Sequence, residues 1–153
     1  MDYSIREATC QCFNRTTQLI GLYPELCILK TEYPDFDHWY FGKVVPEAKL
    51  GLRKIFVVEV NQQHAGVLIL KESEKKICTL RVSPQFQRMG IGNNLINIAF
   101  QELSTHLPFI TVSNSHIDDF SGLFKRHCFQ LKEVHINKYR PGGLEFVYNG
   151  HLN

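Results

Sequence analysis

The chain has 153 residues, 44% of them hydrophobic, and a formal net charge of only +2 at neutral pH. This length and composition exclude a disordered protein and predict a single domain over residues 1–153 with a sizeable core. The low charge gives no concentrated basic surface, so we expect no nucleic-acid partner. No apolar run approaches the roughly 20 residues that span a bilayer, so we expect no membrane partner.

The five cysteines are an odd number, which excludes a fully paired disulfide framework. The first residues lack the basic and then apolar build of a secretory signal. We therefore expect a cytoplasmic protein in which most cysteines are reduced and act as small core residues. Cys10 and Cys12 form a close pair without a second pair at ligand spacing, so we expect no metal.

The first half of the chain predicts a strand, two helices and three more strands. Residues 3–8 alternate polar and apolar side chains, as a strand does. Residues 16–22 have helical spacing, and Pro24 is expected to end that helix. A second helix is expected to begin near Asp35, as its N-cap, and to run toward Val45. The three strands, rich in β-branched and aromatic residues, are 55–60, 65–70 and 77–82, with turns at 61–64 and 71–75.

The second half predicts a long helix followed by shorter elements. Apolar residues recur every four positions in residues 90–107, which predicts a helix with one buried face, closed by Pro108. The remaining predicted elements are a strand at 109–112, a helix at 118–127 and a hairpin of strands 129–138 and 144–148. The order predicts a mixed α/β fold, with a mostly antiparallel mixed sheet of about seven strands and about four helices.

One segment points to chemistry. A strand enters a tight loop that contains Gly90 and Gly92, and the long helix follows at once. The first amides of a helix have no internal partner and carry partial positive charge, so this geometry suits an anion. The glycines let the backbone approach a phosphate, and Arg88 adds a charge. Alternatively, the glycines only relieve steric crowding in a turn. The dinucleotide and Walker motifs do not match.

The same residues carry a family resemblance. Gln87-Arg88-Met89-Gly90-Ile91-Gly92 resembles the Q/R-x-x-G-x-G/A motif of the GNAT superfamily of N-acetyltransferases. Three other segments are similar to elements of that family, so the resemblance covers nearly the whole chain. They are Ile5-Arg6-Glu7-Ala8 at the opening, Leu80-Arg81-Val82-Ser83-Pro84 before the loop, and the late Leu123-Phe124-Lys125-Arg126-His127-Cys128-Phe129, which resembles L-Y-x-x-x-G-F.

The resemblance implies an acetyl-CoA-dependent N-acetyltransferase that moves an acetyl group directly to a primary amine of a small molecule or protein. It implies that the backbones of Leu80 and Val82 pair with the pantetheine arm of the cofactor. It also implies that amides across residues 87–92, with Asn93, hold the pyrophosphate, and that Asn114 lies near the cofactor. The backbone N–H of Val82 or of its neighbour is the expected donor to the developing oxyanion.

The catalytic residues are less well defined, because Phe124 and Cys128 stand where the family has Tyr and Gly. Candidates to replace the tyrosine as proton donor are Tyr139, Ser113 and His116, with a structural role as the alternative for each. The strand 77–82 has no carboxylate, so a water chain is a candidate base. Cys78 on that strand raises the possibility of a nucleophilic thiol. Its apolar neighbours favour the alternative, an inert buried thiol.

The acceptor is not identified by the sequence. Residues 33–40 combine aromatic side chains with Asp35 and Asp37, which suits a cationic amine, although these aromatics also fit a helix packed on the core. A second function stays open because of Phe124, namely a non-catalytic acyl-CoA-binding sensor or scaffold. A homodimer is open as well.

Overall fold

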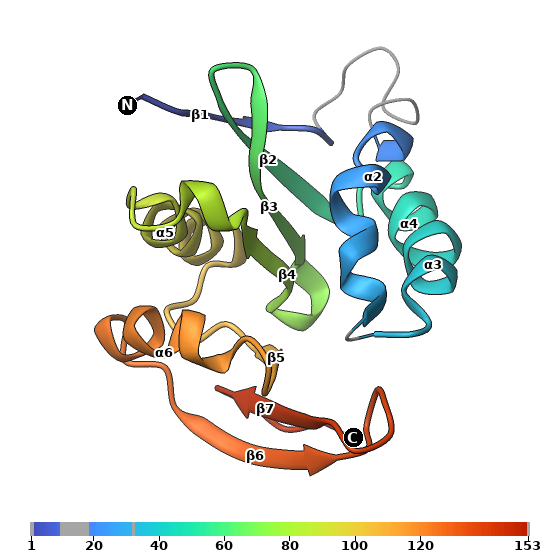
Figure 1. Cartoon of the computed structure of the whole chain (residues 1–153), viewed down its shortest axis with the longest axis vertical. Coiled ribbons are helices and arrows are strands. Elements are labelled where there is room, and N and C mark those ends of the chain that lie inside the picture. The colour runs from blue at the N-terminus through green and yellow to red at the C-terminus, as the bar shows by residue number, and fades with distance from the viewer. Residues whose placement is uncertain (1, 10–18, 32, 153) are drawn as a thin grey trace.

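Two antiparallel sheets organise the computed structural model, which describes residues 2–9, 19–31 and 33–152 (Figure 1). The first sheet has the order β1-β2-β3-β4 and the second the order β5-β7-β6. The strands are β1 (Ser4–Glu7), β2 (Lys54–Val60), β3 (Gln63–Lys71), β4 (Lys76–Val82), β5 (Ile110–Ser113), β6 (Leu131–Ile136) and β7 (Leu144–Tyr148). The predicted mixed α/β fold with about seven mostly antiparallel strands is confirmed, and the strands are divided between two sheets.

A two-residue turn joins β2 to β3. Asn61 and Gln62 have φ values of 49° and 65°, the left-handed geometry that matches the twist of a tight hairpin. The predicted turn at 61–64 is therefore shorter, and β3 begins at Gln63. Lys75 also has a positive φ, of 50°, and ends the short helix η3 (Glu72–Glu74) before β4.

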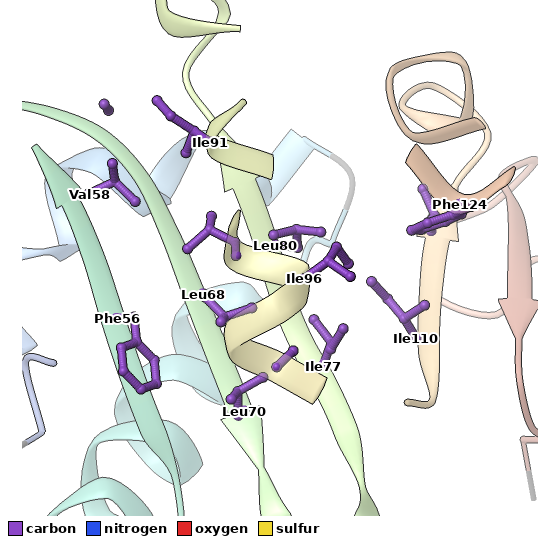
Figure 2. Close-up of a cluster of buried hydrophobic side chains, with 14 of the residues drawn as sticks. Phe56, Val58, Leu68, Leu70, Ile77, Leu80, Ile91, Ile96, Ile110 and Phe124 are labelled. Atoms are coloured by element: carbon purple, nitrogen blue, oxygen red, sulfur yellow. The ribbon is translucent and has the colours of Figure 1, made fainter. Parts of the chain in front are cut away.

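Helices cover both faces of the first sheet (Figure 1). Because side chains alternate along a strand, Phe56 and Val58 of β2 face α5 (Ile91–Leu103), whereas Val57 faces the opposite side. That opposite side is covered by α2 (Tyr23–Leu26), α3 (Phe36–Trp39) and α4 (Val45–Lys49). Figure 2 shows the core under α5, which extends to Ile110 of β5 and to Phe124 of α6 (Ile117–Arg126).

The N-terminal helices differ from the prediction in one respect. Residues 19–21 are helical, as predicted, and that helix gives way to a turn at Leu22, before Pro24. Pro24 also lies in the first turn of α2, so the chain enters a second helix at once. The first turn needs no backbone donor, so proline fits there. Residues 16–18 of the predicted first helix lie outside the described residues. Asp35 is the N-cap of α3, as predicted, but makes no side-chain cap hydrogen bond, and the π-helical turn η2 (Tyr40–Val44) continues α3 into α4.

Helix α5 ends earlier than predicted. Ser104 takes a left-handed conformation with φ of 52°, and its N–H donates to the carbonyls of Gln101 and Phe100. This C-cap stops the helix four residues before the predicted end. Leu107 is consequently 53% exposed, and its predicted place in the buried stripe is wrong. The other stripe residues are buried: Ile91, Leu95, Ala99 and Leu103.

The two sheets touch where β4 and β5 begin. Lys76 and Phe109 form a single parallel bridge, in which the Ile77 N–H donates to the Phe109 carbonyl over 2.8 Å. From Cys78 onward a cleft lies between the two strands, and both line it. This separation is the feature of the fold that creates space for a ligand.

The cysteines and the helix lengths bear on two other expectations. Cys27 and Cys78 are half-buried, Cys128 is exposed, and all three are free thiols. Cys78 packs against the core, whereas Cys128 does not share the role expected for most of the cysteines, and Cys10 and Cys12 lie outside the described residues. Among the helices of the described ranges, none combines the length and the apolar character needed to cross a membrane.

Candidate active site

The cleft between β4 and β5 has a volume of about 740 Å³ and two chemically different ends. We call the first the loop end, which is formed by Pro84, Gln87, Arg88, Gly90, Ile91, Gly92, Asn93 and Arg126. We call the second the inner end, which is formed by Tyr33, Asp35, Trp39, Arg53, Glu74, Lys76, Cys78 and Tyr139. Strand β4 runs between the two ends.

Strand β4 presents main-chain groups to the cleft. The Arg81 carbonyl faces β3, since a Cβ on Gly66 would lie only 2.7 Å from it, and the Ser83 N–H donates to Ala65 of β3. Backbone groups alternate along a strand, so those of Leu80 and Val82 point away from β3 and into the cleft. In agreement, the Val82 carbonyl accepts a hydrogen bond of 3.4 Å from the side chain of Gln87.

A bulge at the start of β4 aims one side chain at the inner end. The register with β3 shifts between Ile69 and Leu70, so that Cys78 is the extra residue on β4. Such bulges re-aim side chains. The Cys78 sulfur accepts a hydrogen bond of 3.1 Å from Arg53, and burial raises the pKa of the thiol. A raised pKa keeps the thiol protonated, which disfavours the nucleophilic role considered for Cys78.

The loop before α5 exposes helix amides to the cleft. Gly90 is the N-cap, with φ of 81°, and no side chain caps the helix. The first intrahelical bond comes from Asn94 N–H to the Gly90 carbonyl, over 3.1 Å, so the three preceding amides are available to an anion. A Cβ on Gly90 would meet nothing within 4 Å. The glycine is thus required by its φ and not by crowding, and the space beside it is open.

Charges at the loop end come from two elements. Arg88 follows β4 and has φ of 64°, and Arg126 ends α6. The side chain of Asn93 is held by His127, with 2.7 Å between the amide oxygen and the imidazole Nε2. Burial lowers the pKa of His127. Asn93 therefore offers its main chain to the cleft, while its side chain ties α5 to the end of α6.

Most of the residues predicted from sequence lie together in the lining of the cleft. They are Leu80, Val82, Gln87, Arg88, Gly90, Ile91, Gly92, Asn93, Ser113, His116 and Tyr139. Met89 instead packs against the core under α5. Asn114 lies beyond the lining, where its side-chain oxygen accepts hydrogen bonds from Arg140 at 3.0 Å and from the Leu144 N–H at 3.3 Å. Asn114 thus holds the loop between β6 and β7.

Phe124 is not in the cleft. It is 2% exposed and packs in an aromatic cluster, with ring centroids 4.8 Å from Phe129 and 4.6 Å from Tyr148 (Figure 2). The helix it belongs to contributes Phe120 and Leu123 to the lining instead. Cys128, at the position of the family glycine, has φ of 60° and so keeps the left-handed conformation that glycine favours.

The three candidate proton donors differ in their surroundings. Tyr139 is 38% exposed, and the partial burial of its phenol raises its pKa. The charge of Glu145 adds to the rise, whereas a hydrogen bond with Thr111 opposes it. The Ser113 hydroxyl is buried and lies 2.8 Å from the Ser115 hydroxyl. His116 pairs with Asp119 at 3.5 Å on the exposed start of α6. Of the three, Tyr139 is the one placed at the inner end.

Asp35 and Asp37, which were predicted as a pair, are separated by the fold. Asp35 lines the inner end. Asp37 accepts a hydrogen bond of 2.6 Å from Tyr23 and pairs with Lys30 at 2.7 Å, and these contacts, that of Lys30 first, lower the pKa of its carboxyl. Only Asp35 is placed to meet a ligand. In the described part of the chain, no group of three or more potential ligand side chains is placed to hold a metal ion.

Several charged residues of this region were not predicted from sequence, and Arg53 and Glu145 are the two that are buried. Arg53 lines the inner end although it is only 5% exposed. Glu145 of β7 is buried behind the lining and accepts a hydrogen bond of 2.8 Å from the Tyr33 hydroxyl. Neither belongs to a motif. The only sequence signal is a charged residue beside or within an apolar strand, at Leu52–Ile55 for the arginine.

The comparisons with known proteins agree with this geometry. The family model described as an acetyltransferase (GNAT) domain matches residues 41–136, more than half of the chain. The chain therefore belongs to the GNAT acetyltransferase family. A search of the curated proteins finds no match.

Solved structures share the fold. A GNAT-family acetyltransferase from Bacillus cereus is 13% identical, with a TM-score of 0.66 over 97% of this chain and 96% of the other. A GNAT-family acetyltransferase from Elizabethkingia anophelis, with acetyl-CoA bound, is 14% identical, with a TM-score of 0.56 over 95% of each chain. A dodecameric spermidine N-acetyltransferase from Vibrio cholerae is also 14% identical, with a TM-score of 0.59 over 95% and 91%.

Proposed function

We propose that this protein transfers an acetyl group from acetyl-CoA directly to a primary amine. The observation that carries the proposal is the continuity of two main-chain surfaces. The open edge of β4, at Leu80 and Val82, leads directly into the uncapped amino end of α5. An extended amide-rich arm suits the first surface and a pyrophosphate suits the second.

In this proposal the loop end holds the phosphates. The amides of Ile91, Gly92 and Asn93 bind the pyrophosphate, and Arg88 and Arg126 add charge-assisted contacts. The pantetheine arm follows β4 and bonds to the backbones of Leu80 and Val82. Because the phosphates lie where β4 ends, the arm runs back toward the start of the strand, and its acyl end approaches Cys78 and the inner end. Asn114 acts indirectly, by holding the hairpin loop that carries Tyr139.

The chemical step takes place at the inner end. The amine nitrogen attacks the thioester carbonyl carbon, the C–S bond breaks, and the sulfur leaves with the bonding electrons. Val82, the expected donor, lies at the phosphate side of β4. The Leu80 N–H also points into the cleft and is only two residues from Cys78, so it is the donor that stabilises the oxygen as it becomes negative. Tyr139, whose raised pKa keeps its phenol protonated, gives a proton to the leaving sulfur. The nitrogen loses its proton through water toward Asp35 or Glu74, the carboxylates that line this end.

A second candidate function is supported by the burial of Phe124. If the family tyrosine were indispensable, its replacement by a phenylalanine inside the core would leave a protein that binds acyl-CoA without turning it over. Both candidates require cofactor binding, so binding alone does not separate them. The position of Tyr139 at the inner end favours the enzyme.

The experiment is to follow thiol release from acetyl-CoA with a panel of polyamines, aminoglycosides, peptides and small primary amines. We expect saturable release with one class of acceptor, and mass spectrometry should find the acetyl group on nitrogen. Binding of acetyl-CoA is measured in parallel by calorimetry. Tight binding without release for any acceptor would support the sensor or scaffold and exclude the transferase.

A further inference from the structure

The inner end of the cleft contains a buried guanidinium. Arg53 lies between α4 and β2, and its side chain is 5% exposed although it forms part of the lining. Its Nε donates to Glu47 of α4 over 2.5 Å, one Nη donates to Cys78 over 3.1 Å, and the guanidinium lies 5.5 Å from the centre of the Trp39 ring. Three elements thus fix one cationic group at the place where the bulge of β4 ends.

The hydrogen bonds of Arg53 leave part of the guanidinium available. A guanidinium has five N–H groups in a planar fork, and the two bonds to Glu47 and Cys78 use only some of them. Arg53 is among the residues that line the cleft, so the N–H groups that Glu47 and Cys78 do not use are the candidates to donate to a ligand there.

Arg53 belongs to a cluster of four charged groups in which Glu47 and Glu74 balance Arg53 and Lys71. The Glu47 carboxylate is shared between Arg53 at 2.5 Å and Lys71 at 3.6 Å, and Lys71 also approaches Glu74 at 3.3 Å. The contact with Arg53, followed by that with Lys71, lowers the pKa of Glu47, so its role is to orient the guanidinium as a fixed anion. Lys76 adds a second cation to the lining of the inner end.

The inner end is lined by both positively and negatively charged side chains. Arg53 and Lys76 are the cations, Asp35 and Glu74 are the anions, and the Tyr33, Trp39 and Tyr139 rings form the walls. A ligand that carries only positive charge would place ammonium groups against a buried guanidinium, which is unfavourable at low dielectric. A zwitterion matches the pattern, with its carboxylate on Arg53 and its ammonium toward Asp35 before deprotonation.

We propose that the acceptor is an amino acid or a similar amine with a carboxylate a few bonds from the nitrogen, and that Arg53 binds this carboxylate. This inference rests on the proposed acetyl transfer. The fork geometry of arginine matches a carboxylate in two hydrogen bonds, which fixes both the position and the direction of the acceptor. With the carboxylate on Arg53 beside Cys78, an amine a few bonds away reaches the acyl end of an arm that follows β4.

The decisive comparison uses the unmodified protein and matched acceptors. Thiol release is measured with three sets of acceptors. They are free amino acids with different side chains, the carboxamide of each amino acid, and the corresponding decarboxylated amine. We expect the preferred amino acid to exceed its own amide by about 10- to 100-fold in kcat/KM, the range that a charged hydrogen-bonded contact supplies. The KM for acetyl-CoA should be the same in all cases.

A pair of variants tests the residue. Arg53→Lys keeps the charge but loses the fork, so we expect the acid-to-amide ratio to fall about 10-fold while acetyl-CoA affinity is retained. Lys71→Gln removes a cation from the same Glu47 cluster at a residue outside the lining, and should leave the ratio unchanged. A general loosening of the cluster would lower turnover of acids and amides alike, and would not move their ratio.

Two outcomes would overturn the inference, and they are distinguishable. If amides and carboxylate-free amines are acetylated as fast as the amino acids, the carboxylate site is wrong and the transferase stands. If no acceptor of any class releases thiol although acetyl-CoA binds, both the transferase and its acceptor site are wrong. The substrate comparison needs no substitution, so it decides the question even if Arg53→Lys fails to fold.

Discussion

The main-chain groups of the loop end come from one short contiguous segment, to which Arg126 of α6 adds a charge, whereas the inner end is made of side chains from several separate segments. Leu80 to Asn93 supplies the β4 edge and the helix amides. The inner end combines Tyr33, Trp39, Arg53, Cys78 and Tyr139, which are distant in sequence. In the proposed function, the first design holds the cofactor whatever the acceptor is, because backbone groups do not depend on side-chain identity. The second is proposed to select the acceptor, so few substitutions would suffice to change it.

The largest expected effect is on the loop end. Gly90→Asp puts a carboxylate beside the amides proposed to hold the pyrophosphate, and we expect acetyl-CoA affinity to fall by about 1,000-fold, or about 4 kcal/mol. Isothermal calorimetry with acetyl-CoA measures this. Gly51→Asp is the matched control, since Gly51 also has a positive φ, of 78°, with nothing within 4 Å of an added Cβ. Equal losses for both variants would mean backbone strain and not charge, and the loop end would not be a phosphate site.

The next effect is on the inner end. Tyr139→Phe removes the proposed proton donor, and we expect kcat to fall by about 100-fold with acetyl-CoA affinity unchanged. Tyr148→Phe is the control, because that ring packs against Phe124 in the core. Steady-state kinetics with the best acceptor measures both. An unchanged kcat for Tyr139→Phe would mean that Tyr139 is not the proton donor and that the sulfur leaves as a thiolate without its help.

The pH dependence gives an independent check of the same residue. A general acid acts while it is protonated, so activity is present below its pKa and is lost as the pH rises through it. Burial and then Glu145 raise the pKa of Tyr139, which places this loss above the usual value of about 10 for tyrosine. The alkaline limb of a kcat profile should therefore lie beyond that value, and Tyr139→Phe should remove it. A limb that persists in the variant would belong to another group.

Helix α6 contributes Phe120 and Leu123 to the cleft and Phe124 to the core, and a substitution of Phe124 tests this assignment. Because Phe124 is enclosed by aromatic rings, Phe124→Tyr should bury a hydroxyl and lower the free energy of unfolding by about 1–2 kcal/mol without raising kcat. Urea denaturation and thiol release measure the two quantities. A rise in kcat would place residue 124 against the leaving sulfur, contrary to its position in the core.

The smallest effect is expected at the end of α6. Cys128 has φ of 60°, which is unfavourable for a residue with a Cβ, so Cys128→Gly should stabilise the protein by about 1 kcal/mol. Thermal unfolding in a reducing buffer measures the gain, and acetyl-CoA affinity should not change. A loss of stability would show that the cysteine side chain makes contacts worth more than the strain.

The sequence was informative where the signal is local. The alternation of apolar residues located the strands, and the glycine spacing of residues 87–92 marked the loop before α5, since both patterns lie within one or two elements. It missed the short helix that has Pro24 in its first turn, and it failed at Leu107. Backbone geometry decided both: proline fits the first turn of a new helix, and Ser104 took the left-handed cap before Pro108 was reached.

By itself the sequence determined the mixed α/β fold, the run of antiparallel strands and the segment that ends β4 and begins α5. Only the tertiary structure decided that β4 and β5 are separated by a cleft, that Phe124 lies in the core, that Asp35 and Asp37 have different neighbours, and that Arg53 faces the inner end. The physical reason is the range of the interactions. Main-chain recognition follows from the local path of the chain, whereas a side-chain site depends on contacts between distant segments, which no local pattern encodes.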